Sequence, residues 1–130
     1  LSNIKFLQSQ PNVNIRANTV FFVLTAQQLP EIIDYFMEEI GSVDHTINPC
    51  GMGQYHLRCR NLSNEIKSLV RKNLNNTFEK YKHNLNIAGN LKNCLLELDN
   101  EGSSNEYMKY FDDIDILQGS DWRKLYPELT

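Results

Sequence analysis

The sequence VFFVL at Val20–Leu24 is an unbroken apolar run, rich in β-branched and aromatic residues. A run of this length without a polar position is typical of a strand that is covered on both faces. Upstream of it, Val13 and Ile15 alternate with polar residues, which also favours extended chain. We therefore predict that Val20–Leu24 is the central strand of a parallel sheet.

A helix and a second strand are predicted to follow. Thr25–Gln28 forms a short polar turn, and the next residues, Leu29–Pro30, place proline where a helix tolerates its missing N–H. Gly41 ends this helix. Its apolar face consists of Ile32, Ile33, Phe36, Met37 and Ile40. Val43–Pro49 then alternates like a strand, so the order is that of a βαβ unit, with Ile47 beside the first strand and both strands parallel.

Three further helices are predicted after a loop at Cys50–Cys59. The first starts near Ser63, and the second ends before Asn100. A serine, Ser103 or Ser104, caps the third. We thus expect the order helix, strand, helix, strand, and then three helices.

The final residues predict a short segment that folds back onto these helices. Gly119 breaks the last long helix, and Pro127 stops the turn that follows. The apolar residues between and beyond them are spaced to share one surface; they are Trp122, Leu125, Tyr126 and Leu129. We expect Gly119–Leu129, named here the terminal clasp, to be a structural cover and not a ligand site.

The composition excludes several classes of protein. With 130 residues, a net charge of −3 and a pI near 5.6, the chain is one domain without the basic surface that nucleic acids require. No apolar run approaches the ~18 residues that cross a bilayer, so no membrane partner is expected. Cys50, Cys59 and Cys94 include no C-x-x-C pair, which argues against a disulfide framework and favours a cytoplasmic location.

The predicted sheet is incomplete. Two parallel strands need cover on both faces and rarely form a sheet alone. The chain also opens with LSNIKFLQSQ, which has the pattern of a helix interior, and Leu1 is not an initiator methionine. We expect a C-terminal piece whose missing strands belong to absent chain or to a protein partner.

Four stretches resemble, in order, segments of one known family. Residues 1–24 resemble a helix and the fifth strand of a barrel, and residues 29–41 with INPC at 47–50 resemble the next helix and the sixth strand. RNLSNEIKSLV (60–70) is similar to the helix opening after that strand. FDDIDILQGSDWRKLYPEL (111–129) looks like the terminal segment. The family is that of radical S-adenosylmethionine enzymes, of the type called twitch domain-containing.

This resemblance implies an α/β fold that is the C-terminal portion of a partial (β/α) barrel, with two parallel strands and extra C-terminal helices. Residues 1–130 form a single domain or fragment, in which 1–60 is the helix–strand–helix–strand barrel part and 61–130 the helical part. The chain departs from the family pattern at Ser63, where proline is usual, and at Gln118, where arginine is usual.

The resemblance also implies cofactors that this chain does not hold by itself. The family binds a [4Fe–4S] cluster through C-x-x-x-C-x-x-C, leaving one iron for S-adenosylmethionine. The three cysteines here have other spacings, and such a cluster requires thiolate ligands. We therefore expect no cofactor and no catalytic residue in this chain alone, which is predicted to be inactive, while the parent cleaves S-adenosylmethionine.

Thr25, Gln27 and Asn48 are the candidate cofactor-binding residues. They follow or end the predicted strands, and parallel α/β folds bind ligands beyond the carboxyl ends of their strands. The alternative is that they serve turns or a helix cap. Thr25 also stands where asparagine often ends the family's fifth strand.

Two other groups of polar residues are assigned no site. Cys50, His56 and Cys59 have a spacing that matches no common structural zinc pattern, so we predict no metal site. Asp112, Asp113 and Asp115 lie on one helical turn, with Asp112 and Asp115 opposite Phe111 and Ile114, and the three are predicted to be a solvated acidic surface.

Two functions from different classes remain open. The first is a C-terminal scaffold segment of a radical S-adenosylmethionine iron–sulfur enzyme. The second is a small non-enzymatic α/β interaction module, whose exposed strand edge binds a protein partner.

Overall fold

The computed structural model describes residues 1–41, 44–51 and 54–130. Its strands are β1 (Arg16–Phe21) and β2 (Asp44–Pro49). Its helices are α1 (Ser2–Gln8), α2 (Leu29–Asp34), the π-helix η1 (Tyr35–Ile40), the 3₁₀ turns η2 (Tyr55–Leu57) and η3 (Cys59–Asn61), α3 (Asn64–Tyr81), α4 (Leu85–Leu98), α5 (Asn105–Gln118), α6 (Trp122–Leu125) and the 3₁₀ turn η4 (Pro127–Leu129). The predicted α/β class and element order are confirmed.

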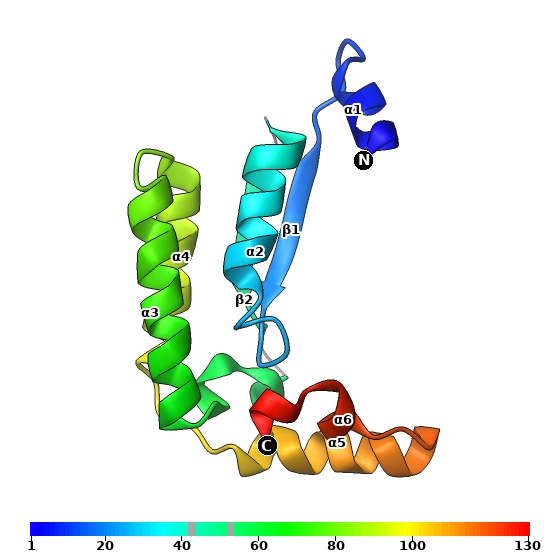
Figure 1. The fold of residues 1–130 in the computed structure, drawn as a ribbon, viewed down its shortest axis with the longest axis vertical. Helices are drawn as coiled ribbons and strands as arrows, with labels where there is room; N and C mark the ends of the chain where they lie inside the picture. The colour runs from blue at the N-terminus through cyan, green and yellow to red at the C-terminus, as the bar shows by residue number, and fades with distance from the viewer. Residues whose placement is uncertain (42–43, 52–53) are drawn as a thin grey trace.

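Figure 1 shows how these elements are arranged. The helices α3 and α4 stand side by side next to the sheet, and α2 lies against the two strands. α1 sits at the end where β1 begins, while α5 runs across the opposite end, where the strands finish. The loop between β2 and α3 lies between that end of the sheet and α5.

The sheet is a parallel pair with one covered face. β1 and β2 pair in register from Arg16 opposite Asp44 to Phe21 opposite Pro49, which confirms the predicted parallel βαβ unit. The covered face carries Phe21 and Ile47, which belong to one core with residues of α2 and α4. The opposite face is exposed on both strands and is called the open face; it consists of Arg16, Asn18, Val20, Asp44, Thr46 and Asn48.

The predicted first strand is wrong in its bounds and its cover. β1 ends at Phe21, and the chain turns from there to Gln28. Val20 is 44% exposed, so the strand is not covered on both faces. The apolar run continues past the strand because Val23 is buried in the core beside the later loop, where its N–H donates to the carbonyl of Leu57 at 3.0 Å.

The helix between the strands changes type halfway. Pro30 lies in the first turn of α2, as predicted, and the chain continues as the π-helix η1. Gly41 ends it with φ of +80°, a conformation that glycine adopts without strain. The second predicted strand is present as β2, while the expected Val43 at its start lies outside the described residues.

The paired helices α3 and α4 begin at side-chain caps. Ser63 accepts from the N–H of Ile66 at 3.3 Å, as its position before the helix predicts, and Asn84 accepts from Ile87 at 3.1 Å. Each cap satisfies a backbone donor that the first turn leaves unpaired. Both helices therefore start at fixed residues.

The link from α4 to α5 passes very close to the loop after β2. The N–H of Ser103 donates to the side-chain oxygen of Asn61 at 3.1 Å. A Cβ atom at Gly102 would overlap that same oxygen and the carbonyl of Arg60. Only glycine fits this approach.

The terminal clasp folds back onto α5, as predicted. Gly119 ends α5 in the left-handed conformation, with φ of +65°. Trp122 is 4% exposed and Leu129 is 2% exposed, and the hydroxyl of Tyr107 donates to the carbonyl of Leu129 at 3.1 Å. Leu125, however, is 70% exposed, because α6 has only four residues and presents one side to the core.

The predicted solvated acidic surface is also wrong for two of its residues. Asp112 accepts from the indole N–H of Trp122 at 2.8 Å and pairs with Arg123. Asp115 accepts from the backbone N–H of Trp122 at 2.8 Å. These carboxylates are spaced to receive the clasp, so they hold it to α5.

Candidate functional site

The three sequence-predicted residues lie near the carboxyl end of the sheet. Thr25 and Gln27 are in the turn after β1, and Asn48 is near the end of β2. The hydroxyl of Thr25 donates to the carbonyl of Val20 at 2.7 Å, and it also accepts from the N–H of Phe22 at 3.2 Å. Both contacts close the turn after β1. The hydroxyl is thus engaged in turn chemistry, the alternative that the sequence left open for this residue.

Asn48 and Gln27 lie in different surroundings. Asn48 is exposed on the open face, opposite Val20 in the register, and its amide donates to the side-chain oxygen of Asn18 at 3.0 Å. Gln27 is half-buried in the turn after β1. Thr25 and Asn48 therefore approach Val20 from opposite sides, because Thr25 binds the carbonyl that points away from β2.

The two edges of the sheet are chemically different. The N–H of Cys50 donates to the carbonyl of Phe21, so Phe21 directs its backbone toward β2. Alternate residues of a parallel strand point to opposite sides, so Asn18 and Val20 direct theirs away from β2. No third strand pairs with this edge within the described residues. Beyond the Val20 carbonyl that Thr25 caps, β1 offers free backbone groups.

The outer edge of β2 is partly covered by α4. The carbonyl of His45 accepts from the side-chain amides of Asn86 at 2.9 Å and Asn90 at 3.0 Å, both on α4. Pro49 has the same orientation as His45 and has no N–H to leave unpaired. α4 thus occupies part of the outer edge of β2, while the described residues place no strand beside the outer edge of β1.

A partly buried group of charges, named the arginine cluster, lies between the loop after β2 and α4. It consists of Arg58, Arg60 and Glu97. Arg60 binds both oxygens of Glu97, with its Nε at 2.9 Å and its Nη2 at 3.0 Å. Glu97 is only 5% exposed. Because a buried carboxylate must be paired, Arg60 is the partner that allows Glu97 to be inside.

Arg58 is the second arginine on the same carboxylate. Its Nε lies 3.4 Å from an oxygen of Glu97 without a hydrogen bond, and this atom is buried without a partner. The side chain is 20% exposed, with its guanidinium 5.9 Å from the ring centre of Tyr55. The residue spacing did not predict this cluster. The signal was Glu97 itself, three residues after the buried Cys94 on the apolar face of α4.

The three cysteines are free and buried. Burial raises the pKa of Cys59, and it raises the pKa of Cys94 to about 12. His56 instead stacks on Tyr110, with ring centres 4.1 Å apart. No set of three histidine, cysteine or acidic side chains in residues 1–41, 44–51 and 54–130 is placed to hold a metal ion.

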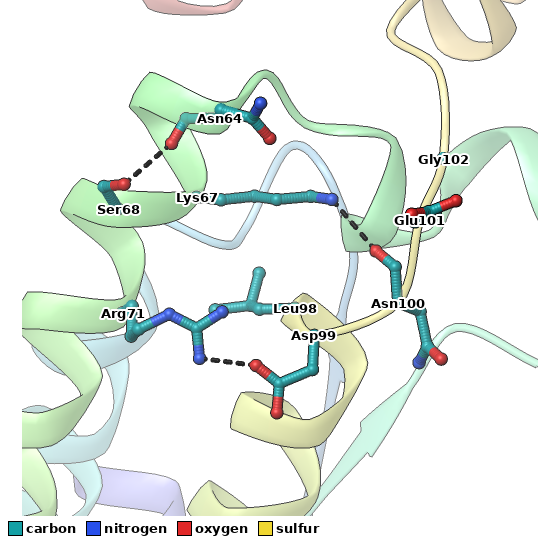
Figure 2. A pocket seen from close by; sticks show the side chains of 9 residues that line it. All are labelled: Asn64, Lys67, Ser68, Arg71, Leu98, Asp99, Asn100, Glu101 and Gly102. Carbon is teal, nitrogen blue, oxygen red and sulfur yellow. Dashed lines mark hydrogen bonds and ion pairs between the residues drawn. The ribbon is translucent and has the colours of Figure 1, made fainter.

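A polar cavity of about 580 Å³ lies between the start of α3 and the end of α4 (Figure 2). Lys67 donates to the carbonyl of Asn100 at 3.0 Å, and Arg71 pairs with Asp99 at 2.8 Å. Both cations that line the cavity are therefore already engaged, and Glu101 adds a second acidic group. This balance gives the cavity no charge preference.

Comparison of the chain with protein-family models, with curated proteins and with solved structures finds no match. Among the helices that the structure describes, none combines the length and the apolar character needed to cross a membrane.

Proposed function

We propose that this chain is a C-terminal scaffold segment of a radical S-adenosylmethionine enzyme, forming the last two strands of a partial (β/α) barrel. The observation that carries the proposal is the one-sided cover of a parallel sheet. Helices pack on the face of Phe21 and Ile47 only, while the open face is polar and exposed. A doubly wound fold has helices on both faces of the sheet, whereas in a barrel the helices cover the outer face alone and the inner faces of the strands face one another across the interior, or lumen.

The edges support the same proposal. The last strand of a partial barrel has one edge without a strand partner, and α4 covers part of the outer edge of β2 because Asn86 and Asn90 bind the carbonyl of His45. The backbone groups of Asn18 and the N–H of Val20 face away from β2 and leave β1 to pair with the preceding strand, although the Val20 carbonyl is already bound by Thr25. The open face would then line the lumen, with Asn18, Thr46 and Asn48 contributing polar groups.

The residues present do not fit the family's iron–sulfur cluster. Its iron atoms require thiolates, and burial raises the pKa of each of the three cysteines. The cluster would belong to the remainder of the parent. For S-adenosylmethionine, Gln27 and Asn48 would supply pocket-wall contacts from this chain, because the hydroxyl of Thr25 is already bonded within its turn.

Amide hydrogen exchange tests the barrel assignment. In the isolated chain, Thr19 and Phe21 should exchange slowly because their N–H groups face β2, while Asn18 and Val20 should exchange fast. In the protein extended upstream of Leu1, all four should be protected. Fast exchange of Asn18 and Val20 in the extended protein would show that no strand pairs there.

The upstream coding sequence separates the two function classes. A C-x-x-x-C-x-x-C motif before Leu1 supports the enzyme segment. A start codon directly before Leu1 instead assigns the free edge of β1 to a strand from another protein, which is the interaction-module function.

A further inference from the structure

Arg58 lies where ligands approach parallel sheets. The loop that carries it crosses the carboxyl end of β1, because the carbonyl of its neighbour Leu57 accepts from Val23, just past that strand. Figure 1 shows this loop between the end of the sheet and α5. In open parallel sheets and in barrels, this end is the usual position of a binding site.

The arginine cluster carries more positive than negative charge. Two guanidinium groups face one carboxylate, and Arg60 already occupies both oxygens of Glu97. Among the ion pairs of the described residues, Arg58 has no other carboxylate partner. A largely buried cation without a complete partner is costly, and this cost is relieved when an anion binds beside it.

We infer that Arg58 is the anchor of a binding site for a small ligand that carries an oxyanion, either a carboxylate or a phosphate. The planar guanidinium group of arginine matches both, because each offers two oxygens to parallel N–H donors. Tyr55 lies beside the guanidinium and would flank the bound group. The site stands whether or not β1 pairs with a further strand.

Other cations of the chain do not meet the same conditions. Arg60 binds both oxygens of Glu97, and Arg71 pairs with the exposed Asp99. Lys80 binds two carboxylates, Asp34 and Glu38, at 2.8 and 2.7 Å. Arg58 combines burial, incomplete pairing and a position at the strand ends.

The test is a titration of the whole chain followed by ¹⁵N–¹H spectra of the arginine Nε–H groups. Sodium phosphate and sodium acetate are added separately, with sodium chloride holding the ionic strength constant. The Arg58 signal, identified by its loss in Arg58→Lys, should shift and reach saturation with at least one of the two anions. A shift that stays linear with both anions, or no shift, would overturn the site.

Two variants separate this site from general effects of salt. Arg58→Gln leaves Glu97 with its full partner Arg60, so the fold should persist, and the Kd for the anion should rise at least ~10-fold. Arg71→Gln is the matched control and should bind as the parent does. If Arg71→Gln loses binding while Arg58→Gln keeps it, the anion occupies the cavity of α3 and α4, and the inference is wrong.

Discussion

The two ends of the chain both place apolar residues on short helical segments, but their surroundings differ. In the terminal clasp, Trp122 and Leu129 are buried against α5. In α1, no residue is buried, and Phe6 is 64% exposed. The clasp packs against aromatic residues of α5 and is bound by two α5 carboxylates, Asp112 and Asp115. Among the described residues, the side chains of α1 form one hydrogen bond to another element, from Gln8 to the carbonyl of Ile40 at 3.2 Å.

This difference shows that apolar spacing alone does not dock a segment. The clasp is held by polar groups at fixed positions: Asp112 and Asp115 on α5, and the hydroxyl of Tyr107. These bonds satisfy donors and acceptors that burial would otherwise leave unpaired. α1 lies at the end of the sheet where β1 begins, and the proposed barrel would supply the missing surface there.

Trp122→Ala should have the largest effect. The indole packs against Phe111 and Tyr107, with ring centres 5.4 and 6.3 Å away, and its N–H is bonded to Asp112. Truncation of a core aromatic side chain costs about 3–5 kcal/mol of unfolding free energy. Urea denaturation measures this as a lower midpoint. An unchanged midpoint would mean that the clasp is undocked in solution.

Tyr107→Phe should have a smaller effect on the same clasp. It removes one buried hydroxyl and leaves the carbonyl of Leu129 without its donor at 3.1 Å. The loss should be about 1–2 kcal/mol, because a buried acceptor is left unpaired while the ring remains packed. Tyr110→Phe is the control, since Tyr110 is 37% exposed. Equal losses for both variants would contradict a specific role for the Tyr107 bond.

Acid should weaken the clasp through Asp112. Hydrogen bonds from Arg123 and Trp122 lower the pKa of this carboxyl below its ordinary value of 3.8. The unfolded chain therefore binds the proton first, so the stabilisation is present above about pH 4–5 and is lost as pH falls through the folded-state pKa. Asp112→Asn should flatten the fall of the denaturation midpoint in this range. Asp113→Asn, at an exposed position, should leave it unchanged.

Phe6→Ala should have the smallest effect in the isolated chain, below about 0.5 kcal/mol, because the ring contacts little. In the protein extended upstream, the proposed barrel predicts a clear loss, since α1 would then be covered. Denaturation of the variant in both lengths measures the difference. A loss already present in the isolated chain would mean that α1 packs there too, and it would remove the contrast with the clasp.

The parts of the fold that were predictable are those with local signals. Local signals mark helix ends: Ser63 precedes α3, and Gly119 follows α5. The spacing of Trp122 and Leu129 likewise predicts that both are buried in the clasp. Val20–Leu24 misled because burial by a later loop leaves the same apolar pattern as burial in a sheet. Val23 and Leu57, whose backbones are hydrogen-bonded, are far apart in the sequence, so local patterns do not reveal that the later loop covers Val23.

The candidate site was less predictable for a related reason. Asn48 was found at a strand end, and the turn role of Thr25 was among the alternatives considered. The partners Arg60 and Glu97 are far apart in sequence, and their pairing depends on how α4 packs against the loop. Arg58 differs from the other arginines because Arg60 binds both oxygens of Glu97, and residue spacing does not predict this geometry.

The close approach at Gly102 has a consequence for which sequences can encode this fold. The position has no room for a Cβ atom against Arg60 and Asn61, so every other amino acid is excluded there, including alanine. Saturation mutagenesis with selection for folded protein should therefore recover only glycine at position 102. At Gly89 and Gly51, an added Cβ atom would have no neighbour within 4 Å, so the selection should recover many different amino acids there. The tolerance of a glycine position to substitution would thus depend on the distance from its Cβ site to the nearest atoms, and not on the fact that the residue is glycine.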